Sequence, residues 1–338
     1  MIASIGRNKS FALLFGASIL LNACGSTENI GSVTTASQST AQSVIVKSPS
    51  DNRQYASIIL DNQLELVLVS DPSIEKSAVA LSVAVGSFQE SKEFAGLAHY
   101  LEHMLMLGTK GYPKAGAYNE FATRNGGMQN AYTDSNHTNY MLAVNNEAFS
   151  EALSRFSELF YQATLDKKYA DKERQSVHSE WVMQSANDWV ILEQLNGATL
   201  NPLHPISQFS WGNLDSLVDK GSISLHAALV DFYDTYYSAN LMKGAMISHL
   251  PLAEMKKLAQ QYFAKIPNKH VPRPQIKATV AKPAHLKKIV HYIPQTNMQQ
   301  LRINFVIARN SAQFAVKPNG YVSYLLDKEM PGTLASVL

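Results

Sequence analysis

The chain has 338 residues, an apolar fraction of 46%, and 29 lysine and arginine residues against 27 aspartate and glutamate residues. This length and apolar content predict a folded protein with room for more than one domain, and they exclude an intrinsically disordered chain. The charge is nearly balanced and lacks the basic surplus typical of proteins that bind phosphate backbones, so we expect no nucleic-acid partner.

The first 23 residues have the parts of a secretion signal. Arg7 and Lys9 precede an apolar run that is too short to span a membrane, and Leu-Asn-Ala then leads to Cys24, the only cysteine. "LNAC" resembles a bacterial lipoprotein processing box, although Asn22 departs from the usual residues. We therefore expect a signal peptide over residues 1–23, a lipid on Cys24, and a location in the bacterial cell envelope, on the periplasmic side of a membrane. The alternative is an ordinary signal peptide followed by a chance cysteine.

The composition also predicts a tether and a domain boundary. Residues 24–50 are rich in Ser, Thr and Gln and poor in aromatic residues, which predicts a disordered tether. The proline-rich stretch KIPNKHVPRPQ favours a boundary at about residue 272. We therefore expect one folded domain over 51–272 and an incomplete second one over 273–338.

Secondary structure is predicted from the spacing of apolar residues. Strands are expected in the β-branched and apolar segments 55–60, 64–70 and 77–87, and a β-hairpin over 128–144. Helical spacing occurs over 94–107, 147–165, 167–195 and 251–263. Near the end, segments 285–294 and 299–308 read as strands, and the last segment, from Asn319, begins as a helix.

The segment HYLEH, residues 99–103, carries the chemistry. On a helix, His99, Glu102 and His103 project from one face. Two imidazoles one turn apart can bind one Zn²⁺ ion, and a glutamate beside them can take a proton from a zinc-bound water. The H-x-x-E-H order is the inverted form of the zincin motif. The alternative is a helix face whose polar residues only meet solvent or each other.

A third metal ligand has to come from another segment. Glu173 and Glu180 lie seven residues apart and therefore on one face of the predicted helix over 167–195. The spacing alone leaves open whether either glutamate is a ligand or a solvated charge.

The segment GLAHYLEHMLMLGTKGYP, residues 96–113, closely resembles the active-site segment of the insulinase/pitrilysin family of zinc metalloendopeptidases. Glu180 ends the segment ERQSVHSE, 77 residues after His103 (180 − 103), which is the family's position for its third ligand. The resemblance implies one Zn²⁺ per chain, bound by His99, His103 and Glu180. It also implies that Glu102 is the general base and that Glu173 supports the site.

The same resemblance implies the fold and the substrate. We expect an α+β metallohydrolase domain, with a largely antiparallel sheet flanked by helices, followed by a truncated second domain of the same type. Such proteins hold a peptide as an added strand at a sheet edge. The expected substrate-binding residues, each of which could instead be an ordinary hairpin residue, are Asn130, Ala131, Tyr132 and Thr133.

The expected function is zinc-dependent endopeptidase action on extended peptides. In the family, a second half contributes an arginine and a tyrosine near the scissile bond, so we expect a C-terminal half or a second subunit as a partner. Two other readings stay open. One is a non-catalytic binding subunit, and the other is a lipid-tethered fragment that stores zinc or captures peptides.

Overall fold

The structure is a computed structural model that describes residues 45–307 and 310–337. Residues Ser48–Thr296 form one compact unit, and residues from Asn297 onward belong to another. The expected signal peptide, Cys24 and most of the expected tether lie outside the described residues. In the part of the chain that is described, no helix is both long enough and apolar enough to cross a bilayer.

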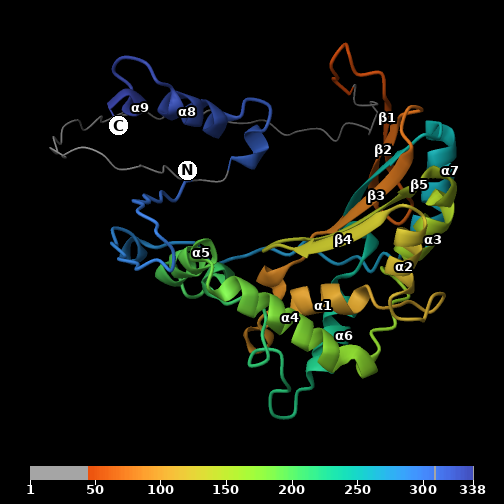
Figure 1. Cartoon of the computed structure of the whole chain (residues 1–338), viewed down its shortest axis with the longest axis horizontal. Coiled ribbons are helices and arrows are strands. Elements are labelled where there is room, and N and C mark those ends of the chain that lie inside the picture. Colours follow the sequence, from red (N-terminus) through yellow and green to blue (C-terminus); the bar gives the residue numbers. More distant parts are fainter. Residues whose placement is uncertain (1–44, 308–309, 338) are drawn as a thin grey trace, which may run out of the picture. The chain divides into compact units, whose positions relative to one another are not determined.

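A six-stranded sheet is the centre of the compact unit (Figure 1). Its strands are β1 (Gln54–Ile59), β2 (Glu65–Ser70), β3 (Lys76–Val83), β4 (Met128–Thr133), β5 (Thr138–Asn145) and β6 (Met242–Ser248). They lie in the order β1-β2-β6-β3-β5-β4, and every neighbouring pair is antiparallel except β2 and β6. The expected α+β class with a largely antiparallel sheet is confirmed.

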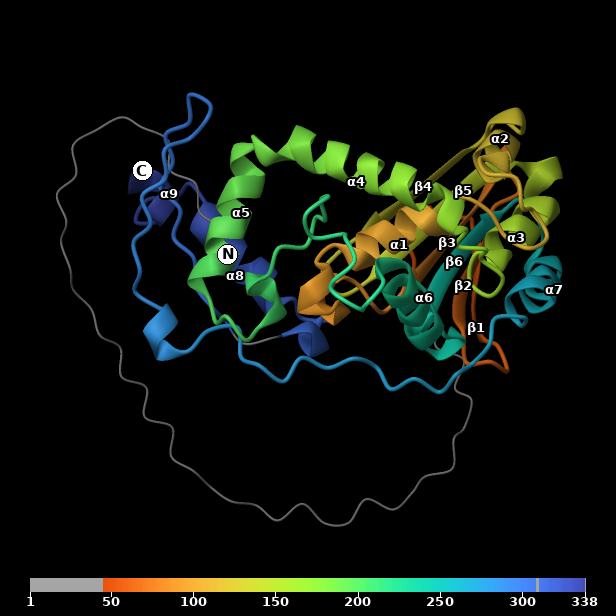
Figure 2. The same cartoon turned by 90° about the horizontal axis from the view of Figure 1, so that it is seen from below.

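One face of the sheet forms the core. Side chains alternate along each strand, so Leu66 and Leu68 of β2 and Leu81 of β3 point to the same face and are almost fully buried. Helices α3 (Phe149–Glu158) and α7 (Leu252–Phe263) pack against this sheet (Figure 2). The outermost strands are β1 and β4.

The other helices of the compact unit are α1 (Leu97–Leu105), α2 (Ala117–Arg124), α4 (Ala170–Ser185), α5 (Asp188–Thr199) and α6 (Leu225–Tyr236). The helix expected over 167–195 is therefore two helices, α4 and α5. The break has a local cause, because the Asn187 side chain accepts a hydrogen bond from the Trp189 amide and caps a new helix.

The strands expected over 285–294 and 299–308 are wrong: the described residues 285–294 and 299–307 form no strand, and only Arg302 takes part in an isolated bridge. The six strands of the described sheet include none from this stretch, and an extended segment outside a sheet is not stable as a strand. Ile289 and Ile293 accordingly are 84% and 87% exposed. The final helix is present as α8 (Pro318–Asp327), followed by the short α9 (Leu334–Val337).

The compact unit extends past the proline-rich stretch. Asp188, the first residue of α5, is buried and accepts hydrogen bonds from Tyr292, Gln295 and Thr296. These bonds fasten residues 292–296 to α5. The domain boundary at 272/273 stays a prediction.

Candidate metal centre and its cleft

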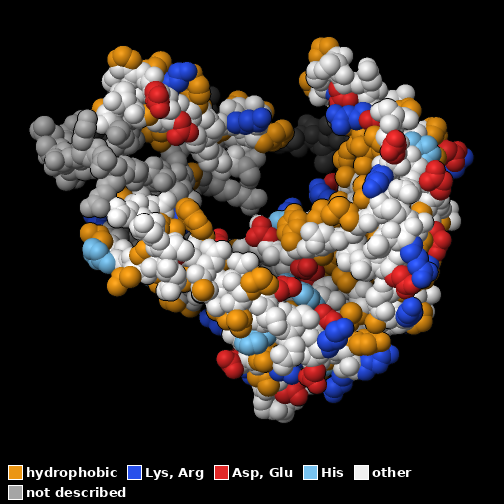
Figure 3. Space-filling view, in the orientation of Figure 1, with side chains coloured by type: hydrophobic (Ala, Val, Ile, Leu, Met, Phe, Trp, Pro, Cys, Tyr) orange, Lys and Arg blue, Asp and Glu red, His pale blue; other side chains and the backbone are white. Residues whose placement is uncertain are grey.

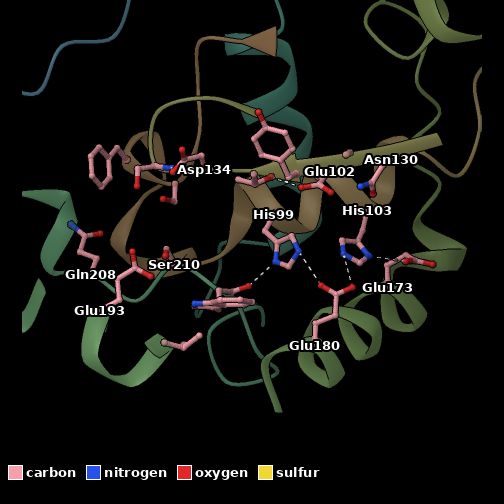
Figure 4. A pocket seen from close by; sticks show the side chains of 18 of the residues that line it. His99, Glu102, His103, Asn130, Asp134, Glu173, Glu180, Glu193, Gln208 and Ser210 are labelled. Carbon is pink, nitrogen blue, oxygen red and sulfur yellow. Dashed lines mark hydrogen bonds and ion pairs between the residues drawn. The ribbon is translucent and has the colours of Figure 1, made fainter. Parts of the chain in front are cut away.

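Helix α1 presents the HYLEH motif because its two faces differ. Leu97, Leu101 and Leu105 are buried in the core beneath the helix. His99 and His103 point the other way, toward α4, and each remains partly exposed (Figure 4). Core packing of the leucines therefore fixes the direction in which both imidazoles project.

The start of α1 is capped by a side chain from outside the helix. Glu90 accepts hydrogen bonds from the Gly96 amide at 2.7 Å and from the Ala98 amide at 2.9 Å. These amides lack partners within the helix, so the carboxyl oxygens of Glu90 satisfy two donors that would otherwise be unpaired. Burial raises the pKa of Glu90 to about 8. Glu90 thus anchors the helix end nearest His99.

Removing this cap is expected to weaken the fold. Glu90→Ala should lower the free energy of unfolding by about 1–2 kcal/mol, because two amides at the helix start lose their acceptor. Urea denaturation of the variant measures the loss. Glu93→Ala, at an exposed glutamate nearby, is the matched control and should leave the free energy of unfolding unchanged. Equal stability of the two variants would contradict the capping role.

Helix α4 brings the two glutamates to α1. Val177 is fully buried and holds the middle of α4 against the protein, which directs Glu173 and Glu180 toward the motif. The Glu173 side chain is only 11% exposed, whereas the Glu180 side chain is 43% exposed. The two carboxylates thus approach the histidines from a buried side and from an open side.

Three side chains converge at the centre of the site (Figure 4). Glu180 places Oε2 3.2 Å from His99 Nε2 and Oε1 3.5 Å from His103 Nε2. One ligand-type atom from each residue lies within 4.8 Å of the other two. Ligands at about 2.0–2.2 Å from a tetrahedral zinc ion are roughly 3–3.5 Å apart, so small movements suffice to fit the ion. Two imidazoles and a carboxylate also suit zinc chemically.

The Nδ1 atom of each imidazole, called its outer nitrogen below, has a hydrogen-bond acceptor. His99 Nδ1 lies 2.8 Å from the Trp211 carbonyl oxygen, and His103 Nδ1 lies 3.4 Å from Glu173 Oε2. An N–H at each Nδ1 leaves each Nε2 lone pair for a metal ion. Glu173 thus contacts His103, and the supporting role that the family resemblance implies for it stays a prediction.

Hydrogen bonds between the histidines and the glutamates shift the pKa values of both partners. Burial disfavours a charged His103, but hydrogen bonds to Glu173 and Glu180 outweigh it and raise the pKa of His103 to about 9. Hydrogen bonds from His103 and His99 hold the pKa of Glu180 well below its usual range. Because a metal-ligating imidazole must be neutral, a metal ion and this proton compete for the site.

Glu102 is a buried acid of the site that accepts a hydrogen bond from β4. The residue is 8% exposed, and burial raises the pKa of its carboxyl group. The Thr133 hydroxyl donates a hydrogen bond to Glu102 Oε2 at 2.6 Å and opposes that shift. Thr133 was expected only as part of a substrate strand, so this contact is an addition to the sequence analysis.

The site opens into a cleft of about 800 Å³ that α1, α4, α5 and β4 help to line. Asn130, Ala131, Tyr132 and Thr133 lie along β4, which borders the cleft. The outer edge of β4 has no strand partner among the described residues. Acidic and histidine side chains are visible between β4 and α4 in the space-filling view (Figure 3). The roles expected for all these residues stay predictions.

Two further contacts of the site could not be predicted from the sequence. The Glu90 cap lies six residues before Gly96, too far for a local capping pattern. The Trp211 contact uses a main-chain oxygen, which no residue type reveals. The signal available for it was Gly212, directly after Trp211, because a glycine can mark a close backbone approach.

Comparison with known proteins gives the family. The model of "Insulinase (Peptidase family M16)" matches residues 65–204, and that of "Peptidase M16 inactive domain" matches residues 224–338. The chain belongs to the insulinase family of peptidases, as the motif predicted.

Similar proteins are considerably longer. Protease 3 of Escherichia coli (strain K12) is 42% identical over 297 residues, which are 88% of this chain and 31% of that protein. Insulin-degrading enzyme of Homo sapiens is 36% identical over 297 residues, 87% of this chain and 29% of that protein. A crystal structure of pitrilysin matches with a TM-score of 0.86 and 42% identity over 88% of this chain and 32% of that chain. The chain thus spans about a third of the length of these relatives.

Proposed function

We propose that the chain is the zinc-binding part of a metalloendopeptidase that cleaves extended peptides. The observation that carries this proposal is the meeting of His99, His103 and Glu180 beside Glu102 in a cleft bordered by an open strand edge. The names of the relatives, Protease 3 and insulin-degrading enzyme, support the same reaction class.

In this proposal each residue of the motif has one role. His99, His103 and Glu180 would hold a zinc ion, which would supply Lewis-acid activation of a water molecule and of a peptide carbonyl. Glu102 takes the proton from the attacking water and passes it to the leaving amine. Burial raises the pKa of Glu102, which favours transient protonation closer to neutral pH.

We also propose that the peptide adds to the sheet as a strand beside β4. The unpaired edge of β4 offers backbone donors and acceptors along Asn130, Ala131, Tyr132 and Thr133. Backbone pairing recognises an extended shape more than a particular sequence. It would also align the peptide along the cleft that contains the histidines.

A second candidate is a peptide-binding fragment that needs a C-terminal half for activity. It is favoured by the length of the chain, about a third of its relatives. If the other half supplies a group that stabilises the oxyanion, its absence would cost about a hundredfold or more in rate.

A fluorogenic peptide assay tests both candidates. We expect the 338-residue chain to bind close to one zinc and to cleave slowly, and a separately produced C-terminal half to restore turnover. A chelator should abolish cleavage, and added zinc should restore it. Full turnover by the chain alone would rule out the need for a second half, and chelator-resistant cleavage would contradict the zinc mechanism.

Membrane attachment through Cys24 is a separate proposal, supported by the sequence before this residue. Cys24→Ser should move the mature protein from the membrane fraction to the soluble fraction, because the lipid needs the thiol. Fractionation of a bacterial host and immunoblotting measure this. A serine variant that stays with the membrane would contradict the lipid anchor.

A further inference from the structure

We propose that the loop Phe209–Gly212 is a positioning element of the metal centre, which orients His99 and ties α1 to α4. The inference rests on the proposed zinc site. It adds residues of a loop that the catalytic motif does not contain.

The first step is the orientation of His99. Its Nδ1 donates a hydrogen bond to the Trp211 carbonyl oxygen at 2.8 Å, and its Nε2 then faces Glu180 Oε2 at 3.2 Å. A carbonyl oxygen can only accept, so it selects the tautomer with hydrogen on Nδ1. The loop therefore keeps the Nε2 lone pair available to the metal ion.

A contact between two glycines holds the Trp211 carbonyl in place. Gly96 and Gly212 both have positive φ, +91° and +81°, and their backbones touch. A Cβ atom on Gly96 would lie 2.2 Å from Gly212 Cα. Only glycine at position 96 permits this contact, which seats the loop directly on the start of α1.

The third step connects the loop to α4. The Phe209 ring meets the Trp181 ring edge-on at a centroid distance of 4.9 Å. The centroid of the Trp211 ring lies 6.3 Å from that of the Trp181 ring. Trp181 directly follows Glu180. A Cβ on Gly212 would also lie 3.0 Å from Val177 Cγ1, in the buried middle of α4. The loop thus contacts both helices that supply metal ligands.

Metal affinity is the direct measure of this role, because residues that orient a metal ligand typically change affinity about 10–100-fold. Gly212→Ala forces a methyl group against Val177, Leu217 and Gly96 and should shift the Trp211 carbonyl. Gly221→Ala is the matched control. Gly221 also has a positive φ, +61°, but nothing lies within 4 Å of its added methyl group.

The experiment titrates the purified full chain with zinc against a chromophoric chelator and records the visible spectrum of bound Co²⁺. We expect Gly212→Ala to raise the Kd for zinc about 10–100-fold and to change the Co²⁺ spectrum, while Gly221→Ala matches the parent. A Gly212→Ala chain with native circular dichroism and parental Kd and spectrum would overturn the inference.

A second variant covers the case in which Gly212→Ala does not fold. Phe209→Ala removes a half-buried ring and leaves the backbone free to keep its path. We expect it to raise the Kd for zinc about tenfold, because the loop loses its contact with Trp181. A parental Kd for zinc in this variant would overturn the role of the loop and leave the proposed function standing. A parent chain that binds no zinc would overturn both.

Discussion

Replacing Glu102 by glutamine is expected to abolish peptide hydrolysis while leaving zinc bound. The amide has almost the same size as the carboxylate, and Thr133 can still donate its hydrogen bond to the amide oxygen. An amide cannot take a proton from water, however. Loss of a general base typically lowers the rate about 10²–10⁴-fold.

The measurement compares cleavage of a fluorogenic peptide with zinc content by elemental analysis. Both are recorded under conditions in which the parent chain cleaves the peptide, with the C-terminal half added if needed. Glu147→Gln, at an exposed glutamate outside the cleft, is the matched control and should retain both activity and zinc. Cleavage near the parental rate in the Glu102 variant would remove Glu102 from the mechanism.

Glu180→Gln is expected to weaken zinc binding more than Glu173→Gln does. Glu180 lies within reach of both Nε2 atoms, so its loss removes a ligand and a negative charge. Glu173 contacts only the outer nitrogen of His103. Loss of such an outer partner costs about 10–100-fold in metal affinity.

Chelator competition on the two purified variants measures this difference. The same substitution at two residues of one helix makes each variant the control for the other. Equal weakening in both variants would contradict the assignment of Glu180 as the ligand and Glu173 as its support. An unchanged zinc affinity in Glu180→Gln would require another third ligand.

Helix α1 and the β4–β5 hairpin could be predicted because their patterns are local. Apolar residues spaced three and four apart are buried along α1, whereas His99 and His103, one turn apart, share the partly exposed side of the helix. Glu180 was different. Its spacing allowed a ligand or a solvated charge, and only the family resemblance chose between them.

Contacts between distant segments could not be predicted in this way. The Thr133 hydroxyl reaches Glu102 because β4 passes beside α1, and the Trp211 carbonyl reaches His99 across 112 residues of sequence. Strand β6 was not predicted from the sequence either. Its segment MKGAMIS contains a lysine and a glycine, yet Gly244 fits where a Cβ would lie 2.7 Å from the Ala80 carbonyl oxygen.

The metal site itself is tested most directly by X-ray diffraction at the zinc absorption edge, from crystals of the chain grown with one equivalent of zinc. We expect one strong anomalous peak, in contact with His99 Nε2, His103 Nε2 and a Glu180 carboxylate oxygen, with Glu102 beside it but outside bonding distance. A peak at other residues, or none between these three side chains, would contradict the proposed metal site.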